Sequence, residues 1–171
     1  MKSTILSVSK FGFVFGLGLC LYTTLMWLTK LDANYLYIGQ YLDIAIILLP
    51  IIIISIAIKQ KNDNDSVKFW ERILIAVYIG LISYLMYEPF LFTYHHYINP
   101  TWFDAVLSLK QSSLEASHAS ADEIKQTLNK MTERNLAQDK IYSLSNFIPS
   151  VLIVPILISL LSILYIRKKK K

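Results

Sequence analysis

Residues 41–58, YLDIAIILLPIIIISIAI, decide the fold class, because eighteen consecutive positions contain a single charged side chain, Asp43. A hydrocarbon layer about 30 Å thick is crossed by about 20 helical residues, so this run predicts a transmembrane helix. Lipid offers the backbone no hydrogen-bond partners, and the run lacks the polar and apolar alternation of a membrane barrel strand. The stretch is therefore expected to be helical.

Three further stretches are similar in length and polarity: residues 11–28, 73–92 and 147–166. Hydrophobic residues make up 54% of the 171-residue chain and charged residues 17%, which is too apolar for an ordinary soluble domain. Lys2 and Lys10 precede the first stretch as in a secretory signal, but no small-residue cleavage site follows it. We therefore expect an all-α, integral membrane four-helix bundle that forms one domain over residues 1–171.

The charged residues divide unequally between the two sides of such a bundle. The segments on one side, including residues 167–171, carry eleven cations and three acids, whereas those on the other carry six cations and seven acids. Lys and Arg accumulate on the cytoplasmic side of membrane proteins, so both termini are predicted to be cytoplasmic. The net charge of +5 thus reflects orientation, and we exclude nucleic-acid binding.

The polar region between the third and fourth stretches predicts an external helical hairpin over residues 99–140. Asn99-Pro100 has the pattern of an N-cap followed by proline at the first helical position. Apolar residues then recur at three-to-four spacing as far as Leu114, and Ser120 with Glu123 forms a capping-box pattern that opens a second helix to about residue 138. Such short helices are stable only if their apolar faces pack on each other, on the membrane surface or on a partner.

Acidic residues inside the predicted spans carry the strongest functional signal, because a charge at bilayer depth costs about 2.5–3.5 kcal/mol on insertion scales. Asp43 and Glu88 both lie toward the outer ends of their helices, and His95 and His96 follow Glu88. Adjacent histidines on a helix point about 100° apart, so no metal site is expected. Two roles stay open for the acids: structural bonding to neighbours and the interface, or a site for a proton, a cation or an amine-bearing ligand.

A strip of small side chains on the first helix predicts close helix packing. Gly12, Gly16 and Cys20 are spaced four apart and would let another backbone approach, either within the bundle or in a second copy of the chain. Cys20 is the only cysteine, which excludes a disulfide framework. No serine arrangement resembles a nucleophile elbow or a triad.

Several short motifs, taken in order, carry a resemblance to a known family. They are FGFVFG at residues 11–16, YE at 87–88, YINP at 97–100, SHASADEI at 117–124 and FIP at 147–149 before the basic tail. In order and spacing they resemble the bacterial domain-of-unknown-function 4199 family over nearly the whole chain. The resemblance implies four helices in the bacterial inner membrane with an external helical insert, and it implies no catalytic residues. It also implies a setting in envelope biogenesis, beside a membrane-associated glycosyltransferase.

Together these features predict a non-enzymatic membrane protein that acts as a partner-binding or accessory subunit in envelope biogenesis. The alternative is a small transporter or lipid-handling protein that uses the carboxylates of Asp43 and Glu88. The expected partners are the lipid bilayer and either another membrane protein or a second copy of the chain. No catalytic residue, cofactor or metal ligand is assigned.

Overall fold

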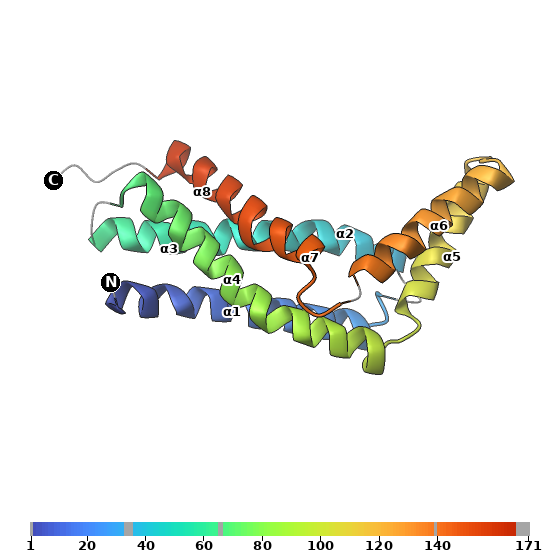
Figure 1. Ribbon diagram of the computed structural model, residues 1–171, viewed down its shortest axis with the longest axis horizontal. Coiled ribbons are helices and arrows are strands. Elements are labelled where there is room, and N and C mark those ends of the chain that lie inside the picture. The colour runs from blue at the N-terminus through green and yellow to red at the C-terminus, as the bar shows by residue number, and fades with distance from the viewer. Residues whose placement is uncertain (1, 33–35, 65–66, 139, 167–171) are drawn as a thin grey trace.

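The computed structural model describes residues 2–32, 36–64, 67–138 and 140–166, and within these every regular element is a helix (Figure 1). Eight segments are α-helical and two are π-helical, here η1 and η2. In chain order they are α1 (Lys2–Leu28), α2 (Leu36–Ile46), α3 (Leu48–Asn64), α4 (Phe69–Thr93), η1 (Tyr94–Ile98), α5 (Trp102–Ala116), α6 (Ala121–Gln138), α7 (Leu144–Phe147), η2 (Ile148–Ile153) and α8 (Val154–Tyr165).

Four helical segments are long and apolar enough to cross a membrane: Val8–Leu28, Tyr41–Asp63, Phe69–Ile98 and Leu144–Tyr165. Many of their large apolar side chains are exposed, among them Leu28, Ile47 and Leu164, which suits contact with lipid. The predicted all-helical class is confirmed for the described residues, together with four segments able to span a membrane. α1 begins and α8 ends at one end of the molecule, and the turn between α5 and α6 lies at the opposite end (Figure 1).

The predicted boundaries were wrong in places, and proline explains the largest difference. The second span, predicted as one helix over residues 41–58, consists of α2 and α3, which meet at Ile47. Pro50 lies in the first turn of α3 and has no N–H to bond the Ile46 carbonyl, so the helix is interrupted just before it. Likewise, η2 contains Pro149 and precedes Pro155, and a widened turn accommodates the missing donors.

The other spans begin earlier than hydropathy indicated. α1 extends back to Lys2, whereas residue 11 was predicted, and α4 with η1 covers residues 69–98, whereas 73–92 was predicted. The last span begins at Leu144 in place of residue 147. Polar residues at these ends remain helical because backbone hydrogen bonding continues past the point where the apolar run stops.

α4 belongs to the third span, and the other three spans pack against it. It contacts α1, α3, η2 and α8, and α3 also contacts α8. A core of buried apolar residues fills the end of the molecule near the α3–α4 turn: Val8, Phe15, Ile54, Ala57, Ile58, Val67, Ile75, Ala76, Ile79, Ile158 and Ile166. At the same end the buried Arg72 guanidinium of α4 donates to the carbonyl oxygens of Ser162 (3.2 Å) and Ile166 (2.8 Å) at the end of α8. α8 is thereby fixed to α4 by a charged donor.

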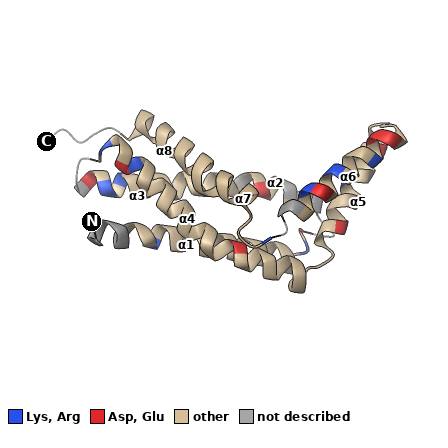
Figure 2. Ribbon diagram, in the orientation of Figure 1, with Lys and Arg blue, Asp and Glu red and all other residues tan. Residues whose placement is uncertain are grey.

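α5 and α6 lie side by side and contact each other (Figure 1). The predicted capping box forms at the start of α6: Glu123 Oε2 accepts from the Ser120 backbone N–H (2.9 Å) and hydroxyl (3.0 Å), and the Glu123 N–H donates to Ser120 Oγ (3.3 Å). These bonds lower the pKa of the exposed Glu123 carboxyl, the backbone bond most. Charged residues of both signs lie along this helix pair, while the spans between the two ends are largely uncharged (Figure 2).

Candidate functional site

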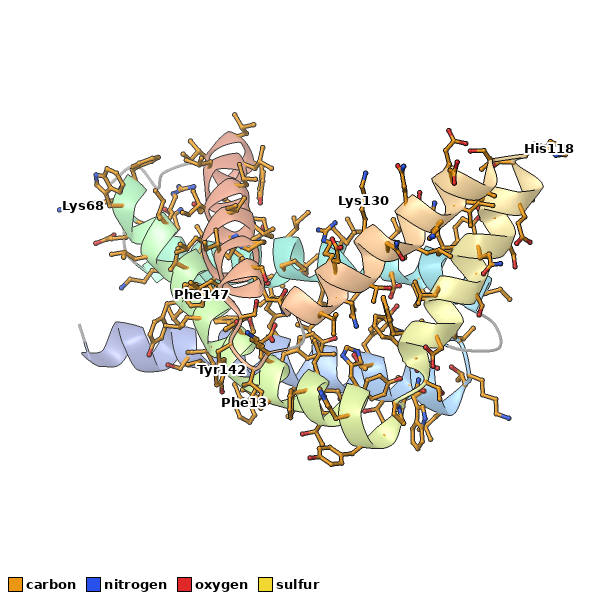
Figure 3. The ribbon with its side chains drawn as sticks, turned by 45° about the vertical axis from the view of Figure 1, so that its right-hand side comes forward. Phe13, Lys68, His118, Lys130, Tyr142 and Phe147 are labelled. Atoms are coloured by element: carbon orange, nitrogen blue, oxygen red, sulfur yellow. The ribbon has the colours of Figure 1, made fainter. Side chains whose placement is uncertain are left out.

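The short helix α7 is held against α4 by aromatic contacts one turn before Glu88. The Tyr84 ring of α4 packs edge-on against Phe147 (centroids 5.4 Å apart) and beside Tyr142 (5.9 Å), both of which Figure 3 labels. Tyr84 also donates its hydroxyl to the Ser143 carbonyl at 3.1 Å. Tyr142 has a φ of 60°, a left-handed conformation that is costly for a bulky residue, so these contacts offset its strain.

This docking places Asn146 of α7 beside Glu88 of α4. The Glu88 carboxylate is only 8% exposed and accepts a hydrogen bond from the Asn146 side-chain amide. The amide is neutral, so the bond satisfies one lone pair without neutralising the charge. A buried carboxylate within a membrane span is retained at a cost in free energy, which makes it a functional hypothesis by default.

Glu88 lines a polar cavity of ≈ 200 Å³ toward the α5–α6 end of the molecule. The walls come from α4, η1, α5, α6, α7 and the chain leading into α7: Glu88, Leu91, Phe92, His95, Trp102, Asn135, Lys140, Ile141 and Asn146. The His95 ring stacks on Trp102, with centroids 4.5 Å apart and planes inclined by 13°. One acid, one lysine, one imidazole and two amides therefore face the same small space.

Glu88 also lines a second cavity of ≈ 370 Å³, which lies among α1, α3, α4, α7, η2 and α8. Most of its lining is apolar, including Phe15, Leu19 and Ile54. Leu91 and Asn146, like Glu88, line both cavities. The carboxylate thus stands where a polar cavity adjoins an apolar one.

The structure brings together only part of the predicted acid and histidine set. Glu88 and His95 line the polar cavity, whereas His96 is exposed, lines a neighbouring cavity of ≈ 240 Å³ and bonds through Nδ1 with the Phe92 carbonyl at 2.9 Å. Asp43 lines none of these three cavities; it lies on α2 and accepts a hydrogen bond from the Tyr22 hydroxyl at 2.7 Å. Among the described residues, no group of three His, Cys, Asp or Glu side chains is placed to hold a metal ion.

A family model described as protein of unknown function (DUF4199) matches residues 10–169, which include all but the first two residues of the four spans, α5, α6 and every described residue lining the polar cavity. The chain belongs to the DUF4199 family. No curated protein and no solved structure matches it. The site of this DUF4199 protein is therefore argued from its own geometry.

The DUF4199 chain also contains a buried polar cluster that sequence reasoning missed. Asp32, 7% exposed, follows α1, and its Oδ2 accepts hydrogen bonds from the Tyr94 hydroxyl and from Asn99 Nδ2 (2.8 Å). Within the described part of the chain, Asp32 Oδ1 has no hydrogen-bond partner. The predicted N-cap role of Asn99 is wrong: α5 begins at Trp102, and the Asn99 amide is engaged by Asp32. The Asn-Pro pattern could equally have indicated a buried turn.

The predicted packing strip of the DUF4199 chain lies against α4. A Cβ atom added to Gly12 would come within 2.7 Å of Ile82 Cβ and 3.1 Å of the Ile79 carbonyl oxygen, and one on Gly16 within 3.1 Å of Met86 Cβ. Cys20, a free thiol one turn further along α1, is half-buried. Close approach of α1 positions the apolar cavity, because Phe15 and Leu19 of α1 form one of its walls.

Proposed function

We propose that this chain is a non-enzymatic membrane protein that binds a lipid-like amphiphile in the two cavities beside Glu88. The observation that carries the proposal is the position of Glu88, Leu91 and Asn146 in the walls of both the polar and the apolar cavity. An amphiphile would place its headgroup in the first and its chain in the second. This is the lipid-handling alternative of the sequence analysis, with Glu88 but without Asp43.

The sizes and chemistry of the cavities support this function. The apolar cavity, ≈ 370 Å³, falls within the range of about 300–1,000 Å³ that is usual for ligand pockets. Such pockets are mostly apolar, with a few polar groups that fix the ligand's orientation, and Glu88, His95 and Lys140 supply those groups.

Filling the shared wall tests the proposal. Leu91→Trp adds bulk where the two cavities adjoin and should remove most of the lipid that co-purifies with the protein in mild detergent, measured by native mass spectrometry. Leu74→Trp is the matched control, since Leu74 also lies on α4 but is 66% exposed. Loss of lipid in both variants, or in neither, would contradict a site at Glu88.

A second candidate function is the accessory subunit expected from the sequence, which would act through the α5–α6 pair. We propose that the four spans form a bundle in the bacterial cytoplasmic membrane, with both termini cytoplasmic and the pair outside as a helical hairpin. None of the described residues of α5 and α6 is buried, so apolar side chains such as Ile124, Leu128 and Met131 keep exposed area that a partner membrane protein could cover. The segregation of charge to the two ends supports this orientation.

One reagent tests orientation and partner binding together. In a Cys20→Ser background, a membrane-impermeant maleimide that carries a photocrosslinker should react with Ser117→Cys in intact cells but not with Asn64→Cys. Illumination should then attach the Ser117→Cys variant to a partner of defined mass. Reaction at Asn64→Cys would contradict the orientation, and a crosslinker that captures nothing would contradict the accessory function.

A further inference from the structure

The polar cavity contains a charge pattern that specifies more than a generic lipid. Among the described residues that line it, Glu88 is the one acid and is nine-tenths buried, and Lys140 is the one lysine and is exposed. His95, Asn135 and Asn146 complete its polar lining. A ligand that neutralises both charged side chains must itself carry one cation and one anion.

We infer that the ligand is a zwitterionic lipid with a primary amine, whose ammonium group pairs with Glu88 and whose anionic group pairs with Lys140. This inference rests on the proposed lipid-binding function and names its headgroup. Aminophospholipids and lipids with an amino-acid headgroup share this chemistry. A purely anionic headgroup would meet the buried Glu88 carboxylate, and a purely cationic one would leave Lys140 unpaired.

The donors and acceptors around Glu88 favour a primary over a quaternary amine. An ammonium group has three N–H donors, and Glu88 and Asn135, from α4 and α6, bring a carboxylate and an amide carbonyl as acceptors to the lining of the same cavity. Quaternary ammonium groups are instead recognised by cages of several aromatic rings. Here the lining contains two such rings, and a face of each is covered by a histidine: Phe92 stacks on His96 (centroids 4.0 Å apart) and Trp102 stacks on His95.

The burial of Glu88 strengthens the selectivity for a lipid with a primary amine. Glu88 is 8% exposed and lies beside an apolar cavity, so a charge-assisted hydrogen bond formed there is screened less than one at the surface. Lys140 is exposed, so its contact with the anionic group is weaker and adds orientation more than affinity. We therefore expect the amine to dominate selectivity.

Competition among defined lipids tests the inference on the full-length protein in mild detergent. We expect phosphatidylethanolamine to bind about tenfold more tightly than phosphatidylcholine or phosphatidylglycerol of the same chains, measured by native mass spectrometry. The second arm compares phosphatidylethanolamine with a single-chain N-acyl amino acid that keeps a free amine. Tighter binding of the N-acyl amino acid would identify the ligand as a lipid with an amino-acid headgroup, and weaker binding would identify it as an aminophospholipid. Equal affinity for phosphatidylethanolamine and phosphatidylcholine would overturn the inference.

Substitutions at Glu88 and Lys140 test whether the preference for phosphatidylethanolamine depends on these two residues. Glu88→Gln keeps the shape of the side chain and should abolish the tenfold preference for phosphatidylethanolamine, whereas Glu133→Gln, on the exposed face of α6, should leave it unchanged. Lys140→Gln should weaken phosphatidylethanolamine but not a long-chain primary amine that has no anion, and Lys130→Gln, which projects from α6 (Figure 3), should alter neither. Unchanged selectivity in Glu88→Gln would overturn the inference.

The outcomes separate this inference from the function on which it rests. If all lipids bind equally and Leu91→Trp displaces them all, the proposed lipid-binding function is supported and the headgroup assignment is contradicted. If no lipid binds, both proposals are contradicted.

Discussion

Replacing Arg72 with methionine is expected to lower the free energy of unfolding in detergent by about 2–3 kcal/mol. The Arg72 side chain is 5% exposed and donates to two carbonyl oxygens at the end of α8, with Ser162 Oγ as a further acceptor at 3.4 Å. The last carbonyls of a helix have no intrahelical donors, and the negative end of the helix dipole attracts a cation. Methionine fills the volume but leaves the Ile166 carbonyl without its charged donor, whereas the Ser162 carbonyl still accepts from the Ile166 backbone N–H at 2.8 Å.

The free energy of unfolding of Arg72→Lys should lie between those of the unchanged protein and of Arg72→Met. An ammonium keeps the charge but cannot present the paired N–H groups of a guanidinium. Arg134→Met, at an exposed position on α6, is the control for loss of an arginine and should change stability little. Chemical denaturation followed by circular dichroism gives the comparison. If the Arg72 and Arg134 variants unfold at the same denaturant concentration, the connection between α4 and α8 does not stabilise the fold.

The contact between α1 and α4 gives the second large effect. Gly12→Ala introduces a Cβ atom 2.7 Å from Ile82 Cβ, which cannot move without shifting α4. Overpacking of this kind costs about 1–3 kcal/mol, which exceeds the roughly 0.5–1 kcal/mol that alanine gains over glycine in a helix. We therefore expect Gly12→Ala to lower the melting temperature in detergent.

Gly18→Ala is the matched control on the same helix. Its added Cβ would lie 3.6 Å from Leu49 Cδ2, an ordinary van der Waals distance, so the helix gain should dominate and stability should be unchanged or slightly higher. The expected result is a loss of stability in Gly12→Ala and no loss in Gly18→Ala. Equal effects at both positions would mean that α1 does not pack closely on α4.

Sequence reasoning found the four segments that are able to span a membrane, because an apolar run of this length is rarely stable in water except as a buried or lipid-facing helix. It also found the start of α6, since the Ser120–Glu123 capping box is a local interaction within four residues. Asn99 was misinterpreted because its amide bonds to Asp32, 67 residues away, and a local capping pattern carries no information about that distant partner. The interruption at Ile47 was missed because the apolar run continues through it, although Pro50 was the visible signal.

The candidate site was predictable only in part. Glu88 is conspicuous because it is acidic within an apolar span, and His95 follows within two turns. Its partner Asn146 and the cavity residue Lys140 come more than fifty residues later, after α5 and α6, so their meeting depends on how α7 docks on Tyr84. Asp43 was grouped with Glu88 only because both lie at a similar depth in their predicted spans. Depth along a span does not determine whether a side chain lines a cavity.

Mapping where a bound lipid reacts tests the central claim most directly. One equivalent of a phospholipid with a diazirine on its acyl chain is added to the protein in mild detergent, illuminated, and located by peptide mass spectrometry. The two-cavity site predicts adducts on the half-buried and buried lining of the apolar cavity, at Leu19, Ile54 and Pro155, and their loss in Leu91→Trp. Adducts spread over outward-facing side chains such as Leu74, Leu85 and Leu164, unchanged by Leu91→Trp, would contradict it.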